Sequence, residues 1–328
     1  MLGRIILVAV LALAGAAGLR AALPSDKEVF APPPARVEKE DPNALWHPQA
    51  DVAKDPPSWY SPAHFEKIGK PGPGDWMEAH PEEPQSFWEY TDDRPVRPTR
   101  MRHTIFLMPV GAVTPKDRER MAILREFVEL YYTLPVETSP WQPLDGVTNR
   151  EREIMGMKRR QYLTGDIMQK VIRTHLPRNA YCILGVTMDD LYPEESWNYV
   201  FGQATLSARV GIYSLVRFYP AFWNQKETPE AEALGLKRSL AVMVHETGHM
   251  FGVQHCQAYE CVMCGCNSLG ESDRRPIHLC PECLKKLRWN VGFDVVARYQ
   301  GLRKFYEAHE MKNEAAWVEQ RIQECRGK

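Results

Sequence analysis

Apolar and polar positions repeat with two different periods along this chain, and each change of period predicts a new element. The run HTIFLMPVG, residues 103–111, is apolar over the length of a strand and ends in Pro-Val-Gly, so it predicts a buried strand. The next segment predicts a helix that Thr114 caps, with Pro115 at its first position and Asp117 completing a capping box. One face of this helix carries apolar residues at helical spacing: Met121, Leu124, Val128 and Tyr131.

The same reasoning predicts five further elements. A second helix is expected from Arg159 to His175, with Pro177 ending it. Its inward-facing residues would be Tyr162, Leu163, Ile167 and Val171. A buried strand follows at 180–188, then two strands within 199–218 that are joined near 208–211, and a long helix from about Glu230 that carries His245. Strands that alternate with helices, followed by two adjacent strands, predict a mixed α/β (α+β) fold.

The N-terminus, residues 1–22, predicts a signal peptide or a signal anchor. A short basic start precedes fifteen apolar residues, which suit the apolar region of an export signal better than a spanning helix of about 20. Small residues near Ala16 offer a cleavage site. We therefore expect an exported protein, secreted or periplasmic, or one that its N-terminus anchors in a membrane.

Proline-rich sequence follows the apolar N-terminus. Residues 23–64 predict an extended tether, although Trp46, Trp59 and Tyr60 are expected to pack on the domain behind it. We place that domain at residues 65–328. The composition is ordinary for a globular protein, with 44% hydrophobic and 25% charged residues and a formal net charge of -1. No basic patch or nucleotide-binding glycine motif is present, so no nucleic-acid partner is expected, and we expect a monomer.

The chemistry of the chain is concentrated in HETGHMFGVQH, residues 245–255. His245 and His249 are four residues apart, so they lie on one face of a helix and can share a zinc ion. Glu246 can reach a water at that metal without being a ligand, which suits a general base.

A third ligand is predicted at His255. Gly252 can adopt a positive φ, end the helix and turn His255 back under the metal. Three protein ligands leave one zinc position open, as in catalytic sites. Gly248 lies inside the helix, where alanine is expected to be favourable unless the backbone is closely packed.

Four cysteines predict a second, structural zinc. Cys256 and Cys261 are followed far downstream by Cys280 and Cys283, and two pairs separated by a long loop have the spacing of a four-thiolate site. Disulfides remain the alternative, because an exported chain meets an oxidising environment. Cys264 and Cys266 are left without an assigned role, and Cys182 is expected to be a small buried apolar residue.

These motifs resemble the archaemetzincin family of zinc metallopeptidases, within the metzincin clan. The join between the third histidine and the first cysteine, His255-Cys256, carries the resemblance, which extends over about residues 65–321. Other stretches similar to the family are 74–87, 185–204 and 279–295. The resemblance implies a zincin fold with a twisted sheet, an active-site helix and a small lower subdomain around the cysteines. It also implies that Met263 is the residue of a Met-turn beneath the three histidines.

The resulting functional expectation is a hydrolase that cleaves peptide bonds in a peptide or protein substrate. It would use two zinc ions, one catalytic and one structural, with Glu246 as general base. The substrate would lie extended beside the edge strand expected within 199–210. The alternative is a catalytically silent, zinc-containing binding module, against which the intact Glu246 argues.

Overall fold

The central sheet has five strands in the order β2-β1-β5-β8-β7, and only β7 runs antiparallel to its neighbour. The computed structural model describes residues 41–205 and 207–327. The strands of this sheet are β1 (Thr104–Val110), β2 (Val136–Thr138), β5 (Ala180–Thr187), β7 (Gly202–Ala204) and β8 (Val210–Ser214). The predicted mixed α/β architecture is confirmed, and β7 forms one edge of the sheet.

Both faces of this sheet are covered, as the continuous apolar runs of β1 and β5 require. In β1, Ile105 and Leu107 pack in the larger core cluster, whereas Phe106 and Met108 pack in a smaller one. The helices α3 (Pro115–Tyr132) and α5 (Pro229–Met250) contribute to the larger cluster, and the π-helix η2 (Ile167–Ile172) contributes to the smaller. Alternate residues of β1 therefore pack against helices on opposite faces of the sheet.

Local sequence signals explain α3. The Thr114 hydroxyl accepts a hydrogen bond from the Asp117 amide, and the capping box is complete. The four apolar residues predicted to face inward are buried, as expected: Met121, Leu124, Val128 and Tyr131. Helix α5 likewise begins at Pro229, one residue from the predicted start, with Thr228 as its N-cap.

The helix predicted from Arg159 to His175 is wrong in its first part. A second, three-stranded sheet forms there, in the order β3-β4-β6, from β3 (Asn149–Ile154), β4 (Met157–Leu163) and β6 (Asp190–Tyr192). Arg159 pairs with Arg152 across the β3–β4 hairpin, and exposed and more buried residues alternate along β4. Helical structure begins only at α4 (Thr164–Asp166) and continues through η2 to η3 (Arg173–His175). Backbone pairing with a neighbouring strand outweighed the local helical pattern.

The turn between β7 and β8 also lies earlier than predicted. Val210 and Gly211 belong to β8, whereas the turn ends at Arg209, which has a φ of 63°. The Thr205 hydroxyl donates a hydrogen bond to the carbonyl of Val210 across this turn. The predicted pair of adjacent strands is otherwise present.

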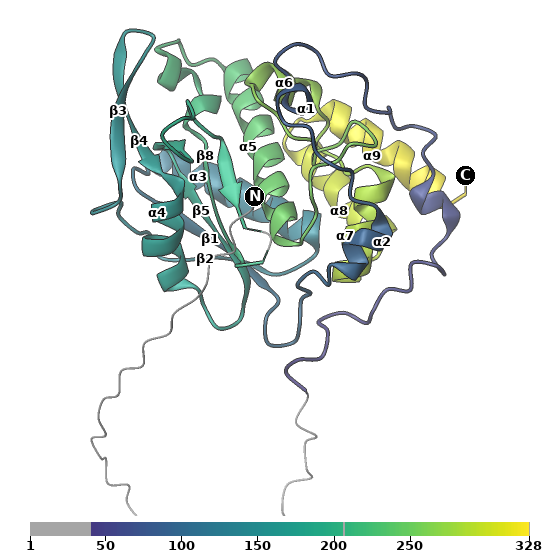
Figure 1. The fold of residues 1–328 in the computed structure, drawn as a ribbon. Coiled ribbons are helices and arrows are strands. Elements are labelled where there is room, and N and C mark those ends of the chain that lie inside the picture. The colour runs from purple at the N-terminus through teal and green to yellow at the C-terminus, as the bar shows by residue number, and fades with distance from the viewer. Residues whose placement is uncertain (1–40, 206, 328) are drawn as a thin grey trace, which may run out of the picture. The chain divides into compact units, whose positions relative to one another are not determined.

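The chain after α5 forms a mainly helical part that packs beside the sheet (Figure 1). Its helices α8 and α9 contact each other, and α2 contacts α7. The remaining helices are α1 (Trp76–Ala79), α2 (Phe87–Asp92), α6 (Leu269–Arg274), α7 (Pro281–Val291), α8 (Val295–Ala308), α9 (Lys312–Cys325) and the short η1 (Pro57–Tyr60), η4 (Val216–Phe218) and η5 (Pro220–Trp223).

The part of the proline-rich segment that the structure describes, residues 41–64, belongs to the same compact unit as the chain that follows it, and this unit begins at Asp41. Trp46 stacks on His103 with 3.6 Å between ring centroids, and Trp59 and Tyr60 pack on the larger core cluster. The predicted signal or anchor, residues 1–22, and the first part of the tether lie outside the described residues. Among the residues described, no helix is both long and apolar enough to cross a membrane.

Candidate active site and metal centres

Helix α5 places two histidines on one face, and the chain then turns to bring a third beside them. The Nε2 atoms of His245 and His249 are 3.0 Å apart. The ring of His255 lies 5.3 Å from that of His245 and 4.9 Å from that of His249, measured between centroids. One ligand atom from each of the three residues lies within 4.8 Å of the other two. Two nitrogen ligands of a tetrahedral zinc are separated by roughly 3.3 Å, so the arrangement fits one ion.

The other ring nitrogen of each histidine is engaged by the protein. Nδ1 of His245 lies 2.8 Å from the carbonyl oxygen of Val262, and Nδ1 of His249 lies 2.8 Å from that of Val253. Nδ1 of His255 lies 2.9 Å from the carboxylate of Glu82. Partners of this kind fix the tautomer that leaves Nε2 free for a metal.

Burial favours the neutral imidazoles that a metal needs. Burial first, and the neighbouring His255 second, lower the pKa of His245 to about 3. The pKa of His249 is also held well below its usual value, first by burial and then by the two other histidines. Only an unprotonated ring nitrogen can bind a cation. His245 and His249 are therefore neutral and able to bind a metal near neutral pH.

Glu246 lies beside the three histidines, under the edge strand β7. Its side chain is buried, and burial raises the pKa of its carboxyl to about 8. A Cβ atom added to Gly202 of β7 would come within 2.8 Å of this carboxyl group. The carboxylate and the three histidines line the same cleft of about 920 Å³, together with β7. The cleft can therefore hold an extended peptide against a strand edge, beside these four residues.

Gly252 makes the turn that the sequence predicts. The helix ends at Met250, and Gly252 has a φ of 81°. Its position is also crowded, because a Cβ atom there would lie 2.8 Å from the Cβ of Pro95.

Met263 packs directly beneath this helix. The side chain is fully buried, and a Cβ atom added to Gly248 would come within 2.5 Å of the Met263 sulfur. Gly248 is therefore closely packed against Met263, which is the exception stated for the favourable effect of alanine at this position. The Met263 carbonyl accepts a hydrogen bond from the amide of Cys256. Met263 thus contacts both the helix that carries His245 and one of the four clustered cysteines, and it links the two candidate metal sites.

Replacement of Gly252 by alanine is expected to weaken zinc binding at the histidines more than it lowers overall stability. The substitution adds about 1 kcal/mol or more of backbone strain and a clash with Pro95, and relief of either would displace His255. Gly146→Ala is the matched control, because Gly146 also has a positive φ, 73°, but open space around it. Zinc affinity and melting temperature of both variants check this. A Gly252→Ala protein that binds zinc as tightly as the parent would show that the turn does not deliver His255.

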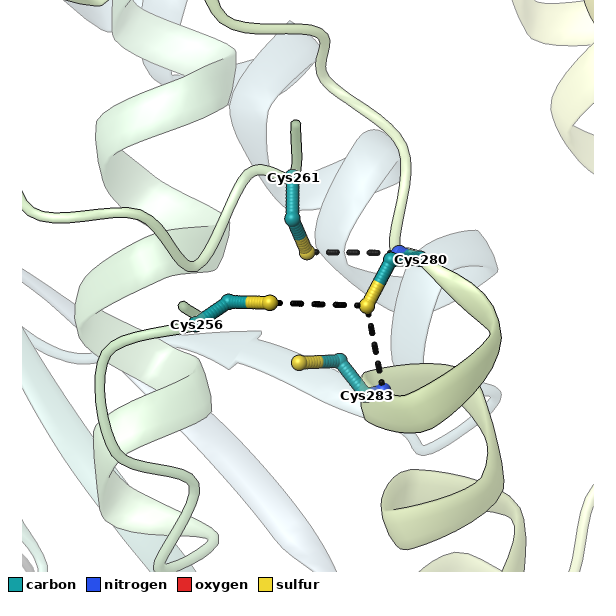
Figure 2. Close-up of side chains that lie close together, drawn as sticks. All are labelled: Cys256, Cys261, Cys280 and Cys283. Atoms are coloured by element: carbon teal, nitrogen blue, oxygen red, sulfur yellow. Dashed lines mark hydrogen bonds between the residues drawn. The ribbon is translucent and has the colours of Figure 1, made fainter. Parts of the chain in front are cut away.

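The four predicted cysteine ligands converge on one point (Figure 2). Cys256, Cys261, Cys280 and Cys283 are buried, and their sulfur atoms all lie within 4.8 Å of one another. The sulfurs of Cys256 and Cys280 are 3.5 Å apart. A tetrahedral zinc with sulfur ligands at 2.3 Å separates them by roughly 3.8 Å, so this set also fits one ion.

Backbone amides orient the sulfurs of this cluster. The amide of Cys280 donates to the Cys261 sulfur at 3.2 Å, and the amide of Cys283 donates to the Cys280 sulfur at 3.5 Å. Hydrogen bonds from the neighbouring thiols lower the pKa of the Cys256 thiol, whereas burial raises that of Cys261. These shifts favour a thiolate at Cys256 and a protonated thiol at Cys261.

Of the other cysteines, Cys264 and Cys266 line the same cleft as the three histidines. Cys264 also lies beside the four-sulfur group, because it interacts with Cys256 and both thiols donate to the Tyr259 carbonyl. Cys182 is fully buried in β5, as predicted. All eight cysteines are free thiols in this structure.

Sequence reasoning did not single out Glu82. The stretch 74–87 entered only through its resemblance to the family, and nothing in its spacing pointed to His255. A carboxylate that binds a histidine from 173 positions away leaves no local periodic signal.

A helix that carries two histidines and a carboxylate, ended by a glycine turn that brings a third histidine beside them, is the arrangement typical of zinc-dependent metallopeptidases. The family model described as Peptidase family M54 matches residues 147–289. Archaemetzincin-2 of Rattus norvegicus is 35% identical over 270 residues, which cover 74% of this chain and 75% of the rat protein. The chain belongs to the archaemetzincin family.

Two further proteins are similar to this chain. Archaemetzincin-2 of Homo sapiens is 35% identical over 271 residues, again covering 74% of this chain and 75% of the human protein. The solved structure of archaemetzincin from Methanopyrus kandleri is 26% identical, with a TM-score of 0.46, and covers 60% of this chain and all of that one. The resemblance stated from the motifs is confirmed at the level of the family.

Proposed function

We propose that His245, His249 and His255 hold the catalytic zinc and that Glu246 is the general base of peptide-bond hydrolysis. The convergence of the three imidazoles within 4.8 Å is the observation that carries this proposal. Zinc bound there supplies a Lewis acid for the scissile carbonyl and the attacking water. The carboxylate of Glu246 accepts the proton of that water and gives it to the leaving amine.

Glu246 is suited to this role by its surroundings. It is adjacent in sequence to the first histidine and lies in the same cleft, but it is not among the three converging ligand groups. Burial raises its pKa to about 8, and a general base is most effective when its pKa lies near the working pH. A nearby cation would favour the ionised form and so move this pKa down.

The substrate is proposed to extend along β7. This strand is the edge of the sheet, it borders the cleft, and its Gly202 approaches Glu246 without a side chain between them. Unpaired backbone groups of an edge strand can bind an extended peptide as an added strand. Such binding would place a peptide bond over the histidines.

Gly202→Ala is accordingly expected to lower kcat by about 10- to 100-fold, because the new methyl group would push the Glu246 carboxyl out of place. Gly165→Ala is the control, since a Cβ atom at Gly165 meets nothing within 4 Å. Steady-state hydrolysis of one peptide by both variants checks this. Parental kcat in Gly202→Ala would contradict the proposed contact between β7 and the general base.

We propose a second, structural zinc at Cys256, Cys261, Cys280 and Cys283. Its support is the convergence of four buried sulfurs within 4.8 Å and the amide hydrogen bonds to two of them. The two sites should then differ in how they release metal. The histidine site opens onto a cleft and should lose zinc to a chelator first, whereas the thiolate site is enclosed.

Elemental analysis during stepwise chelation tests these assignments. We expect two zinc ions per chain at the outset, loss of activity as the first is removed, and recovery when zinc is added back. One zinc per chain, together with no reactive thiol at the four cysteines, would replace the second metal by disulfides. Full activity in a protein stripped of all zinc would contradict the catalytic role.

The N-terminal segment, residues 1–22, is proposed to direct export, either as a cleaved signal or as an anchor. Its support is the basic start and the fifteen apolar residues that follow. Determination of the mature N-terminus checks this. A start near Ala22 favours cleavage, an intact N-terminus in the membrane fraction favours the anchor, and an intact soluble chain contradicts both.

A further inference from the structure

The three histidines are not held in the same way. His245 and His249 use backbone carbonyls of Val262 and Val253, which lie within 17 residues of them in sequence. His255 instead contacts both carboxylate oxygens of Glu82 at 2.9 Å. This carboxylate belongs to a distant segment, residues 72–85, which we call the N-terminal strap.

His255 needs support of this kind more than the other two. His245 and His249 are fixed by the hydrogen bonds of α5, but His255 lies beyond the helix end in a stretch without regular structure. A carboxylate that accepts the Nδ1 proton keeps the ring in the tautomer that offers Nε2 to a metal, and it raises the basicity of that nitrogen. A mobile third ligand would weaken the site as a whole.

Glu82 is itself held in place. The indole nitrogen of Trp76 donates to one of its carboxylate oxygens at 3.1 Å, and the Trp76 ring lies edge-on to His255 at 5.0 Å. The side-chain amide of Gln257 donates to the Glu82 carbonyl at 2.7 Å. The Trp76 ring also fills the space over Gly265, where a Cβ atom would come within 2.4 Å of it.

The N-terminal strap also contacts the segment that leads to His255 through a second residue, Gln85. The Gln85 side chain donates to the carbonyl of Gly252 at 3.2 Å and accepts from the amide of Gln254 at 3.2 Å. The strap thus binds both sides of the turn that carries His255. Its other end is fixed on α6, where the Trp76 amide donates to the carboxylate of Glu271 and α1 lies beside α6 (Figure 1).

From this geometry we infer that Glu82 is a positioning residue of the catalytic metal site, which acts through its contact with His255. The inference rests on the proposed function, since it requires that His255 bind the metal. The strap lies outside residues 147–289, the part of the chain that the Peptidase family M54 model matches. Glu82, which lies far upstream of the histidine motif in sequence, therefore holds the third histidine of that motif, His255, in position.

The test compares Glu82→Gln, Glu82→Ala and the neighbouring exposed Glu83→Gln for zinc affinity, measured by competition with a chelator. Removal of a carboxylate that orients a ligand typically costs 10- to 100-fold in metal affinity. We expect about tenfold weaker binding at the histidines in Glu82→Gln, up to about 100-fold in Glu82→Ala, and parental affinity in Glu83→Gln. The cysteine site should keep its metal in all three proteins.

Two further readouts separate a positioning role from a general loss of structure. The visible absorption of Co²⁺ bound at the histidines should change in Glu82→Gln, because the geometry of one ligand changes. The melting temperature of the metal-free protein should stay that of the parent. Parental zinc affinity and an unchanged cobalt spectrum in Glu82→Ala would overturn the inference, as would an equal loss of stability with and without metal. A parent protein that binds no metal at the histidines would instead overturn the proposed function.

Discussion

A Glu246→Gln protein should retain zinc at the three histidines and lose turnover by on the order of 10²- to 10⁴-fold in kcat. The substitution removes the carboxylate that accepts the proton of the attacking water, yet it leaves the size of the side chain and all three histidine ligands unchanged. The amide can neither take up nor return a proton at neutral pH. We expect the loss in kcat rather than in KM, because Glu246 acts on the reacting water and not on the peptide.

The measurement is steady-state hydrolysis of one peptide, with zinc content determined on the same samples. Thr247→Ser is the control for the effect of changing a buried residue of this helix. It keeps a hydroxyl at a buried position that is outside the three converging ligands. Near-parental kcat in Glu246→Gln would remove Glu246 from the mechanism. Loss of zinc along with activity would mean that the variant does not isolate the base.

Substitution of Cys280 by serine should destabilise the whole domain, by about 3–5 kcal/mol or more. Cys280 is fully buried, its sulfur accepts a hydrogen bond from the Cys283 amide, and it caps α7. Its loss opens the four-sulfur cluster that joins the segment after His255 to α7. A structural zinc contributes directly to the free energy of folding, so the melting temperature should fall steeply.

His249→Ala should behave in the opposite way. It should abolish activity and leave one zinc per chain, with a much smaller change in melting temperature, because the histidine site opens onto the cleft and the cysteine site is intact. Cys266→Ser is the matched control for Cys280→Ser, since Cys266 lies outside the four-sulfur group. A Cys280→Ser protein with the parent's melting temperature and two zinc ions would exclude a structural metal at this cluster.

The parts of the fold that the sequence predicted are those that local interactions determine. Helix α3 was predictable because its cap, its proline and its apolar face lie within one stretch of chain. Residues 159–163 were not, because their strand conformation depends on pairing with β3. The helical spacing of Leu163, Ile167 and Val171 gave no sign of this pairing. Pairing between separate segments outweighs the preference of either one.

The residues of the candidate site likewise divide into those that one local segment predicts and those that only the folded chain brings together. His245, Glu246, His249 and His255 were predictable because helix geometry and one glycine relate them within eleven residues. Glu82 was not, because the fold brings it to His255 from a distant segment. The close contact between Gly248 and Met263 was missed for the same reason, since packing distances are set only once the chain has folded.

Cleavage of a peptide library by the zinc-loaded protein, with mass spectrometry of the new termini, tests the central claim most directly. Glu246→Gln at the same zinc content and the chelator-treated parent serve as blanks. We predict a defined set of new termini in the zinc-loaded parent, their absence from both blanks, and their return when zinc is restored to the chelated protein. No cleavage of any peptide by a parent that carries zinc at the histidines, or the same termini in all three samples, would contradict a zinc peptidase with Glu246 as its base.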